Sequence, residues 1–352
     1  MQAAFIKGPA TDESNDPGKI QMIRVCPLCA GTQVSGFLKA PDRLHWRKDV
    51  YTLRRCSLCS CVWLNDPPKP EEMGIHYDEE YHKVVTGGGE QSADRRWQRQ
   101  RDVIHHHKQG GTILDVGCSS GGFLSTMKGG PWKLYGIEME ESTAARARVK
   151  TGAEVFVGDA VRGPFPEGFF DVVTAFDLLE HVYAPRELLG KVLEWLKPGG
   201  IFLAMVPNID SWEARLFGSY WYGLELPRHL FHFSPRSLRQ LVAVAGFEEV
   251  SVDTPRVSYV AESAEYVYSR VIEKLGFSPT PRLKPRPRTL ARRVIGKGIY
   301  VLFLAPFAQL ASWAGTGPSL EVILRKPPGD QPQLVEGVQA HRLTGQESDR
   351  SC

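Results

Sequence analysis

Short apolar runs, separated by amphipathic stretches, dominate the middle and the end of the chain. Seven runs have the length of buried strands, at residues 113–116, 133–137, 154–157, 170–176, 201–206, 248–253 and 319–324. Helix-period segments occupy residues 95–108, 185–196, 235–245 and 261–275. Ser234 and Pro235 are typical of a helix start, and Gly246 of its end. This alternation predicts an α/β fold built on one mainly parallel sheet.

The first strand leads into a tight glycine turn. Residues 113–124 read Ile-Leu-Asp-Val-Gly-Cys-Ser-Ser-Gly-Gly-Phe-Leu. Because Gly117, Gly121 and Gly122 carry no Cβ, the backbone of this turn can approach a nucleotide-like ligand closely. The second strand ends on Glu138, at about the distance at which nucleotide folds place the carboxylate that holds two ribose hydroxyls.

Acidic residues also follow the third and fourth strands, as Asp159 and Asp177. The carboxyl ends of parallel strands lie at one edge of a sheet, where open α/β folds bind their ligands. We therefore expect these polar side chains to gather around one site.

Four motifs resemble those of class I S-adenosylmethionine-dependent methyltransferases, in particular a bacterial branch that is similar to ubiquinone and sugar methyltransferases. They are Leu114-Asp115-Val116-Gly117-Cys118, Phe170-Asp171-Val172-Val173, Leu179-Glu180-His181-Val182 and Leu196-Lys197-Pro198-Gly199-Gly200. The resemblance covers roughly residues 75–326. It implies a Rossmann-like seven-stranded methyltransferase sheet that binds S-adenosylmethionine. A degenerate fold that has lost its ligand is the alternative.

The resemblance implies which residues meet the methionine end of the cofactor. Asp115 orders the glycine turn and approaches the amino-acid group of the cofactor. The backbone of Gly117 lines the same group, and Gly121 belongs to the same turn. Asp177 lies near the methionine moiety and the methyl group. The family usually has a further glycine where this chain has Ser119, so a stiffer turn is expected.

Three further residues are assigned to the nucleoside end of the cofactor by the same resemblance. Glu138 holds the ribose, and Asp159 with Ala160 meets the adenine. These roles are carried over position by position from the family.

Two histidines are candidate catalytic bases, because an imidazole can take up a proton near neutral pH. His181 follows the fourth strand, in a run so widespread in the resembling branch that a structural role is the alternative. His229 lies in residues 221–233, which combine aromatic, basic and imidazole groups as sugar or phospho-sugar pockets do. Its alternative is a lid histidine that is hydrogen-bonded to backbone.

Four of the seven cysteines form two Cys-x-x-Cys pairs. The pairs are Cys26 with Cys29 and Cys56 with Cys59. Four thiolates at this spacing are typical of structural Zn²⁺, so we predict a small amino-terminal zinc ribbon with four cysteine ligands. Cys61 competes with Cys59 as the fourth ligand, and a redox pair is the alternative to metal.

The predicted organisation has five parts. They are a mobile leader (1–22), the zinc ribbon (23–65), a linker and lead-in segment (66–92), a class I methyltransferase domain (93–326) with an insertion (256–318), and a disordered tail (327–352). Within the ribbon, residues 34–38 and 50–54 read as short strands.

The insertion contains a basic, proline-rich run and then an apolar segment at residues 299–314. This segment is shorter than the ~20 residues that span a bilayer. An apolar helix beside Lys and Arg suits an anionic membrane surface, so residues 282–316 are expected to make peripheral membrane contact. Packing on the sheet or a dimer contact is the alternative.

Composition adds few constraints. The net charge of +3 over 352 residues argues against nucleic acid as the main partner. The sequence shows no signal peptide, so we expect the protein in the cytoplasm, with the inner face of the membrane as a second location. The oligomeric state is not indicated.

The resemblance and the ribbon together predict methyl transfer from S-adenosylmethionine to a small or lipid-linked acceptor, such as a sugar or a glycolipid intermediate. One alternative is a quinone-type O-methyltransferase at the membrane. An alternative of another class is a zinc-ribbon module that binds nucleic acid or protein, with the methyltransferase domain as a scaffold.

Overall fold

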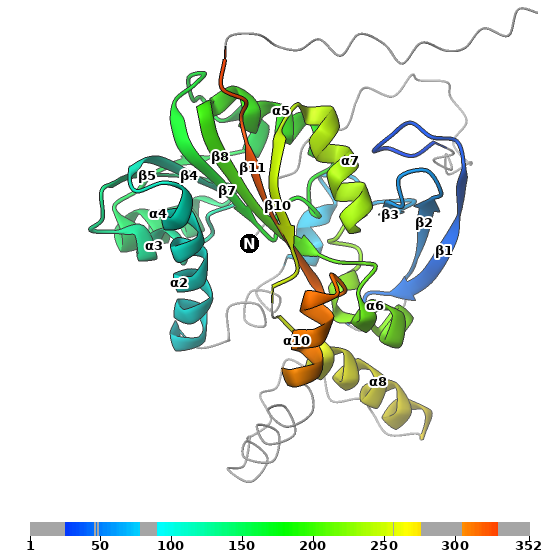
Figure 1. Ribbon diagram of the computed structural model, residues 1–352. Coiled ribbons are helices and arrows are strands. Elements are labelled where there is room, and N and C mark those ends of the chain that lie inside the picture. Colours follow the sequence, from blue (N-terminus) through cyan, green and yellow to red (C-terminus); the bar gives the residue numbers. More distant parts are fainter. Residues whose placement is uncertain are drawn as a thin grey trace, which may run out of the picture.

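The computed structural model describes residues 25–45, 47, 49–77, 90–255, 257–275 and 305–329. These residues form a large sheet with helices on both faces and a smaller sheet beside it (Figure 1). Several predicted segments lie outside the described residues: the leader (1–22), residues 78–89 of the linker and lead-in segment, the basic run and residues 299–304 of the apolar segment, which fall in 276–304, and the tail beyond residue 329.

The large sheet has seven strands in the order β10-β11-β8-β7-β4-β5-β6. They are β4 (Gly111–Val116), β5 (Trp132–Glu138), β6 (Glu154–Val157), β7 (Phe170–Phe176), β8 (Leu196–Pro207), β10 (Glu248–Asp253) and β11 (Ser319–Arg325). Strands β4 to β8 pair in parallel, whereas β11 is antiparallel to both of its neighbours. Each predicted run lies inside one strand, and the predicted Rossmann-like α/β fold is confirmed.

Alternate residues of the central strands pack against different helices, because successive side chains of a strand point to opposite faces. Ile113 and Val172 belong to a cluster with residues of α2, α3 and α4, whereas Leu114 and Val173 belong to a cluster with α5 and α7. The helices are α2 (Glu90–His107), α3 (Leu124–Met127), α4 (Glu141–Thr151), α5 (Pro185–Trp195) and α7 (Pro235–Ala245). Figure 1 shows these two groups on opposite sides of the sheet.

Helix α7 begins and ends where its sequence predicts. The hydroxyl of Ser234 accepts a hydrogen bond from the amide of Ser237, and Pro235 occupies the first helical position. Gly246 ends the helix with a left-handed φ of 87°. Helix α2 starts at Glu90, five residues before the predicted start.

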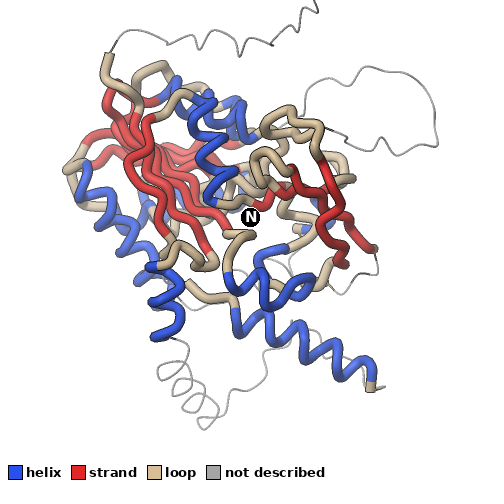
Figure 2. Tube along the Cα trace, turned by 45° about the vertical axis from the view of Figure 1, so that its right-hand side comes forward, coloured by secondary structure: helices blue, strands red, loops and turns tan. Residues whose placement is uncertain are grey.

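The small sheet joins the amino-terminal region to the large domain. Its strands are β1 (Val34–Pro41), β2 (Val50–Cys56), β3 (Val62–Leu64) and β9 (Phe231–His232), in this order. The sequence predicts β1 and β2, but not that β9 completes the sheet. The amide of Leu64 donates to the carbonyl of Leu230, and both sides share one hydrophobic cluster. The predicted ribbon and the large domain therefore share one core, and Figure 2 shows the small sheet beside the large domain.

Short elements complete the described part of the chain. They are the 3-10 turns η1 (Met73–His76), η2 (Ala160–Arg162), η3 (Gly218–Tyr220) and η4 (Tyr222–Leu224), and the helices α6 (Trp212–Phe217), α8 (Val260–Lys274) and α10 (Ala305–Trp313). Helices α8 and α10 belong to the predicted insertion and lie near each other at one end of the molecule (Figure 1). Within the described residues, every helix is too short or too polar to cross a bilayer.

Candidate active site and metal centre

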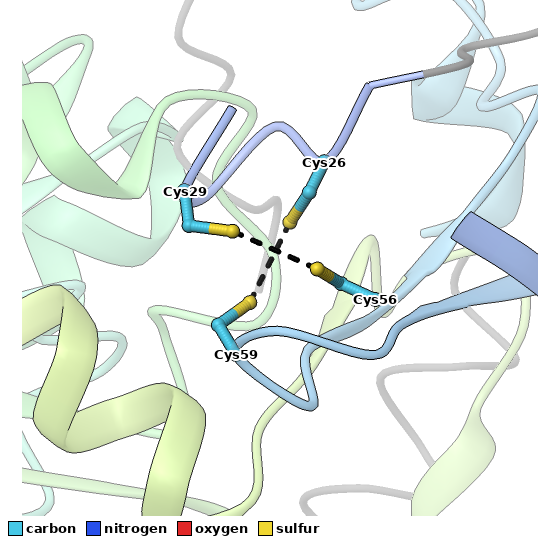
Figure 3. A group of neighbouring side chains, drawn as sticks. All are labelled: Cys26, Cys29, Cys56 and Cys59. Atoms are coloured by element: carbon cyan, nitrogen blue, oxygen red, sulfur yellow. Dashed lines mark hydrogen bonds between the residues drawn. The ribbon is translucent and has the colours of Figure 1, made fainter. Parts of the chain in front are cut away.

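Four sulfur atoms converge between the two Cys-x-x-Cys pairs (Figure 3). The Sγ atoms of Cys26 and Cys59 are 3.6 Å apart, and so are those of Cys29 and Cys56. All four lie within 4.8 Å of one another. Thiolates at about 2.3 Å from a tetrahedral zinc ion are about 3.8 Å apart, so the donor set fits Zn²⁺.

The two cysteine pairs repeat one backbone turn. The amide of Ala30 donates to the carbonyl of Cys26, and the amide of Ser60 donates to that of Cys56, both at 2.9 Å. Ala30 and Ser60 have φ values of 58° and 63°, in the left-handed region. The turns thus present both sulfurs of each pair to the same point.

Cys61 takes no part in this cluster. Its thiol is buried and directed at the carbonyl of Val62, at 3.6 Å. The geometry therefore places Cys59, not Cys61, with the other three sulfurs. A hydrogen bond from Cys59 lowers the pKa of Cys26 to about 5, which favours the thiolate form that metals bind.

At the carboxyl edge of the large sheet, Asp115 lies near the end of β4. Its Oδ1 accepts a hydrogen bond of 2.7 Å from the hydroxyl of Thr174 on β7. Burial raises the pKa of Asp115 to about 7, against the opposing effect of this hydrogen bond. The carboxyl group can therefore change its charge near neutral pH.

Glu138 ties the glycine turn to the end of β5. Its Oε2 accepts from the amide of Ser119 at 3.0 Å, and its Oε1 from that of Glu140 at 3.1 Å. Ser119 has a φ of 49°, which explains why glycine suits this position in the resembling family. Gly117 has a φ of 75°, and a Cβ there would lie 3.0 Å from the side chain of Leu178. The turn thus has little room for larger residues.

The remaining predicted cofactor residues, Gly121, Asp159 and Ala160, pack against or cap neighbouring elements. Gly121 faces α4, where an added Cβ would lie 2.7 Å from the methyl group of Thr151, so this glycine closes the turn onto the helix. Asp159 caps η2 by accepting from the amide of Val161 at 3.1 Å, and burial raises its pKa. Ala160 is fully buried. Their predicted contacts with adenine remain predictions.

Asp177 follows β7 with a left-handed φ of 50°. Its carboxylate accepts a hydrogen bond from Arg96 of α2, whose guanidinium lies 4.5 Å from the ring centroid of Trp97. Both partners of the ion pair are more than a third exposed. The positively charged Arg96 thus lies beside Asp177, the residue that is predicted to lie near the methionine end of the cofactor.

The predicted bases meet inside the molecule. The ring centroids of His181 and His229 are 4.6 Å apart and the rings are nearly perpendicular. One nitrogen of each ring and a carboxylate oxygen of Glu180 lie within 4.8 Å of one another. Both oxygens of Glu180 are buried without a hydrogen-bond partner among the residues that the structure describes, and burial raises its pKa. Such a donor set can hold a divalent cation or a polar group of an acceptor.

Both imidazoles are neutral. Burial lowers the pKa of His181 to about 3 and that of His229 below its usual range. Nδ1 of His229 donates to the carbonyl of Gly223 at 2.9 Å, which leaves its Nε2 as an acceptor. Nδ1 of His181 lies 3.0 Å from the carbonyl of Arg228 and 2.9 Å from the hydroxyl of Tyr77. Hydrogen bonds thus orient both rings.

The segment 221–233 differs from the expected sugar pocket. Trp221, Phe233 and Arg228 are almost completely buried. The guanidinium of Arg228 is bound to Asp42 and Glu225, so it is not available to a phosphate. The reason is that β9 pairs with the small sheet, and these side chains fill the junction.

Sequence reasoning does not identify Asp42, Arg96 or Thr174 as site residues. Thr174 could have been recognised in the sequence, because it is a polar residue in the apolar part of β7. Arg96 and Asp42 could not, because their partners lie far away in the sequence.

The central part of the chain matches a known protein family. Residues 90–252 match a family model described as a methyltransferase domain. The matched range runs from α2 into β10 and contains all the predicted cofactor-binding residues and both candidate bases. This chain contains an S-adenosylmethionine-dependent methyltransferase domain.

Individual relatives of the methyltransferase domain are distant. A "Probable S-adenosylmethionine-dependent methyltransferase" of Mycolicibacterium smegmatis is 26% identical over 160 residues, which cover 43% of this chain and 59% of that protein. A "Ubiquinone biosynthesis O-methyltransferase" of Burkholderia thailandensis is 25% identical over 161 residues, 42% of this chain and 69% of that protein. A solved methyltransferase of Archaeoglobus fulgidus is 18% identical, with a TM-score of 0.46, and covers 71% of this chain and all of that one.

The metal centre can be tested with two matched cysteine variants. We expect the wild-type protein to bind about one zinc ion per chain, and Cys56→Ser, which removes one of the four sulfurs, to bind none. Cys61→Ser should retain zinc, because its thiol lies outside the cluster. Elemental analysis of the purified variants measures this. Equal zinc in wild type and Cys56→Ser would exclude the proposed site.

The buried carboxyl of Asp115 predicts a pH dependence of stability. Its pKa rises from the ordinary 3.8 to about 7, so the folded chain keeps a proton that the unfolded chain has lost. Without cofactor, stability should therefore fall as pH rises from about 4 to 7. Asp115→Asn, which can still accept from Thr174, should make this fall smaller.

Urea unfolding at a series of pH values measures the effect. Asp102→Asn is the matched control, since Asp102 is an exposed residue of α2 and should leave the pH dependence unchanged. An unaltered slope in Asp115→Asn would show that this carboxyl is ionised in the folded state throughout that range.

Proposed function

We propose that the protein transfers the methyl group of S-adenosylmethionine to a small or lipid-linked acceptor. One observation carries the proposal: Asp115, Glu138 and Asp177 end neighbouring strands of one sheet, and His181, four residues after Asp177, forms a buried pair of imidazoles with His229. The cofactor would supply an electrophilic methyl group, and these chain residues would bind and orient it. The methyltransferase-domain match supports the reaction type.

His181 and His229 are the proposed bases. Their rings are neutral, so each can accept a proton from an acceptor hydroxyl as the methyl group arrives. Because the two rings are in contact, loss of either one also changes the surroundings of the other. We favour His229, because Nδ1 of its ring meets a carbonyl, which fixes Nε2 as an acceptor, whereas Nδ1 of His181 meets both a carbonyl and the hydroxyl of Tyr77.

The acceptor is proposed as a sugar or glycolipid intermediate, with a quinone-type ring as the alternative. The burial of Arg228 removes the basic group that a phospho-sugar would need in the 221–233 segment. The name of the Burkholderia relative favours a quinone-type ring and O-methylation. Transfer of labelled methyl from S-adenosylmethionine into a lipid extract, compared with a nucleotide-sugar pool, separates a lipid-linked acceptor from a soluble sugar, and chromatography of the labelled lipid then distinguishes a glycolipid from a quinone.

Membrane contact through residues 282–316 is part of the proposal. In the described part of this segment, Leu310 and Trp313 of α10 are 59% and 75% exposed. Leu275, which follows α8, is 65% exposed. Apolar and tryptophan side chains of this kind insert at the boundary between headgroups and acyl chains. Such contact would bring the methyltransferase domain to a lipid-linked acceptor.

The alternative function, in which the ribbon binds nucleic acid or another protein, has less support. Arg43 donates to the carbonyl of Ser219, and Arg55 forms an ion pair with Asp210, so two of its basic groups face the large domain. We propose that the ribbon holds a structural zinc ion and braces the domain of residues 93–326.

Histidine variants test the chemistry. We expect His229→Ala to reduce methyl transfer about 10²–10⁴-fold, because that is the usual contribution of a general base. Binding of S-adenosylhomocysteine, measured by calorimetry, should be unchanged, since the cofactor edge is formed by other residues. His106→Ala, at an exposed position on α2, is the control. Full transfer activity in both His181→Ala and His229→Ala would rule out histidine as the base.

Vesicle flotation tests the membrane contact. The full chain should float with vesicles that contain phosphatidylglycerol, and a chain lacking residues 282–316 should not. Leu310→Ser with Trp313→Ser should reduce flotation, because both exposed apolar groups are lost. Val149→Ser changes another exposed apolar residue, on α4, and is the control. Failure of the full chain to float would exclude peripheral binding.

A further inference from the structure

A buried ion pair connects the ribbon to the segment that carries His229. The side chains of Asp42 and Arg228 are both fully buried. Nη1 of Arg228 lies 3.4 Å from Oδ2 of Asp42, and Nη2 lies 3.4 Å from Oδ1. Asp42 belongs to the turn after β1, whereas Arg228 lies in the loop before β9. The two charges therefore fix two distant parts of the chain against each other.

The surroundings of Asp42 hold it ionised. The amides of Leu44 and His45 donate to its Oδ1, and the ring of His45 lies 3.0 Å from its Oδ2. Burial opposes ionisation, but the hydrogen bond with His45, the ring of His76 at 3.6 Å and the charge of Arg228 bring the pKa of Asp42 below its usual range. A charged acceptor thus faces the guanidinium.

From Arg228 the contacts continue to both imidazoles. Its backbone carbonyl lies 3.0 Å from Nδ1 of His181. Its Nε donates to Oε1 of Glu225 at 3.2 Å, while Oε2 of Glu225 lies 3.6 Å from Nε2 of His229. Arg228 therefore fixes two groups that contact the candidate bases. Its own carbonyl contacts His181, and the carboxylate of Glu225 contacts His229.

We propose that Asp42 of the ribbon is a positioning residue for the active site, acting through Arg228 to hold His181 with its proton on Nδ1. A carbonyl oxygen only accepts, so a hydrogen bond with Arg228 requires Nδ1–H and leaves Nε2 of His181 as an acceptor. The hydroxyl of Tyr77, at 2.9 Å from the same nitrogen, would impose the opposite tautomer if it donated. Because Asp42 and Arg228 hold the carbonyl of Arg228 in place, we expect the tautomer with the proton on Nδ1 of His181.

The ribbon thus has a role inside the protein. The proposed zinc site would stabilise the ribbon that carries Asp42, and Asp42 would align the imidazoles, while the cofactor edge on β4 and β5 is built without ribbon residues. This role rests on the proposed function only for the task of the imidazoles. Absence of methyl transfer would remove that task without changing the tautomer result.

Nitrogen-15 NMR of the full chain, labelled at histidine, tests the proposal. The resonances of His181 are assigned by their loss in His181→Gln. In the wild type we expect a protonated Nδ1 and an unprotonated Nε2. Asp42→Asn keeps the side-chain volume but removes the charge. The proton of His181 should then move to Nε2, or the two tautomers should interconvert and give averaged nitrogen resonances. Arg228→Gln should give the same change.

Arg55→Gln is the matched control, because it removes another ion pair between the ribbon and the large domain, with Asp210, that does not contact the imidazoles. It should show the wild-type pattern. S-adenosylhomocysteine affinity should stay the same in all folded variants. Wild-type protein with the proton on Nε2 of His181 would overturn the proposal, as would an unchanged pattern in Arg228→Gln and Asp42→Asn. If Asp42→Asn does not fold, Asp42→Asn with Arg228→Gln, which removes both charges of the pair, decides by the same criterion.

Discussion

The buried ion pair of Asp42 and Arg228 joins the amino-terminal strands to the segment that carries His229. Neither charge reaches solvent, so each depends on the other for stabilisation. Removal of one partner from such a pair typically costs about 3–5 kcal/mol, since the remaining charge stays buried. The pair therefore holds the small sheet, the 221–233 segment and the imidazoles in one arrangement.

The proposed active site combines two kinds of structure. Its proposed cofactor side uses the ends of parallel strands, where Asp115 and Glu138 are fixed by Thr174 and by backbone amides. The side that carries His229 uses loops, which need outside support to be precise. The ribbon gives that support, because β3 pairs with β9 directly after the loop.

Burial shifts the pKa values of the groups at this site toward their uncharged forms. It raises the pKa of Asp115, Glu138 and Glu180, and it lowers the pKa of both histidines. Clusters of shifted groups are typical of functional sites. A sulfonium ion at this edge would favour the ionised carboxylates, which links cofactor binding to the protonation of the site.

Local structure could be predicted from the sequence: each strand of the large sheet, the caps of α7 and the two cysteine turns follow from short-range patterns. The shared edge of Asp115, Glu138 and Asp177 could be predicted too, because parallel strands end together. Three other features became visible only in the folded chain: β9 completes the small sheet, Arg228 faces Asp42, and Arg96 binds Asp177. Pattern and propensity act over a few residues, whereas these contacts join segments that are distant in the chain and leave no periodic signal.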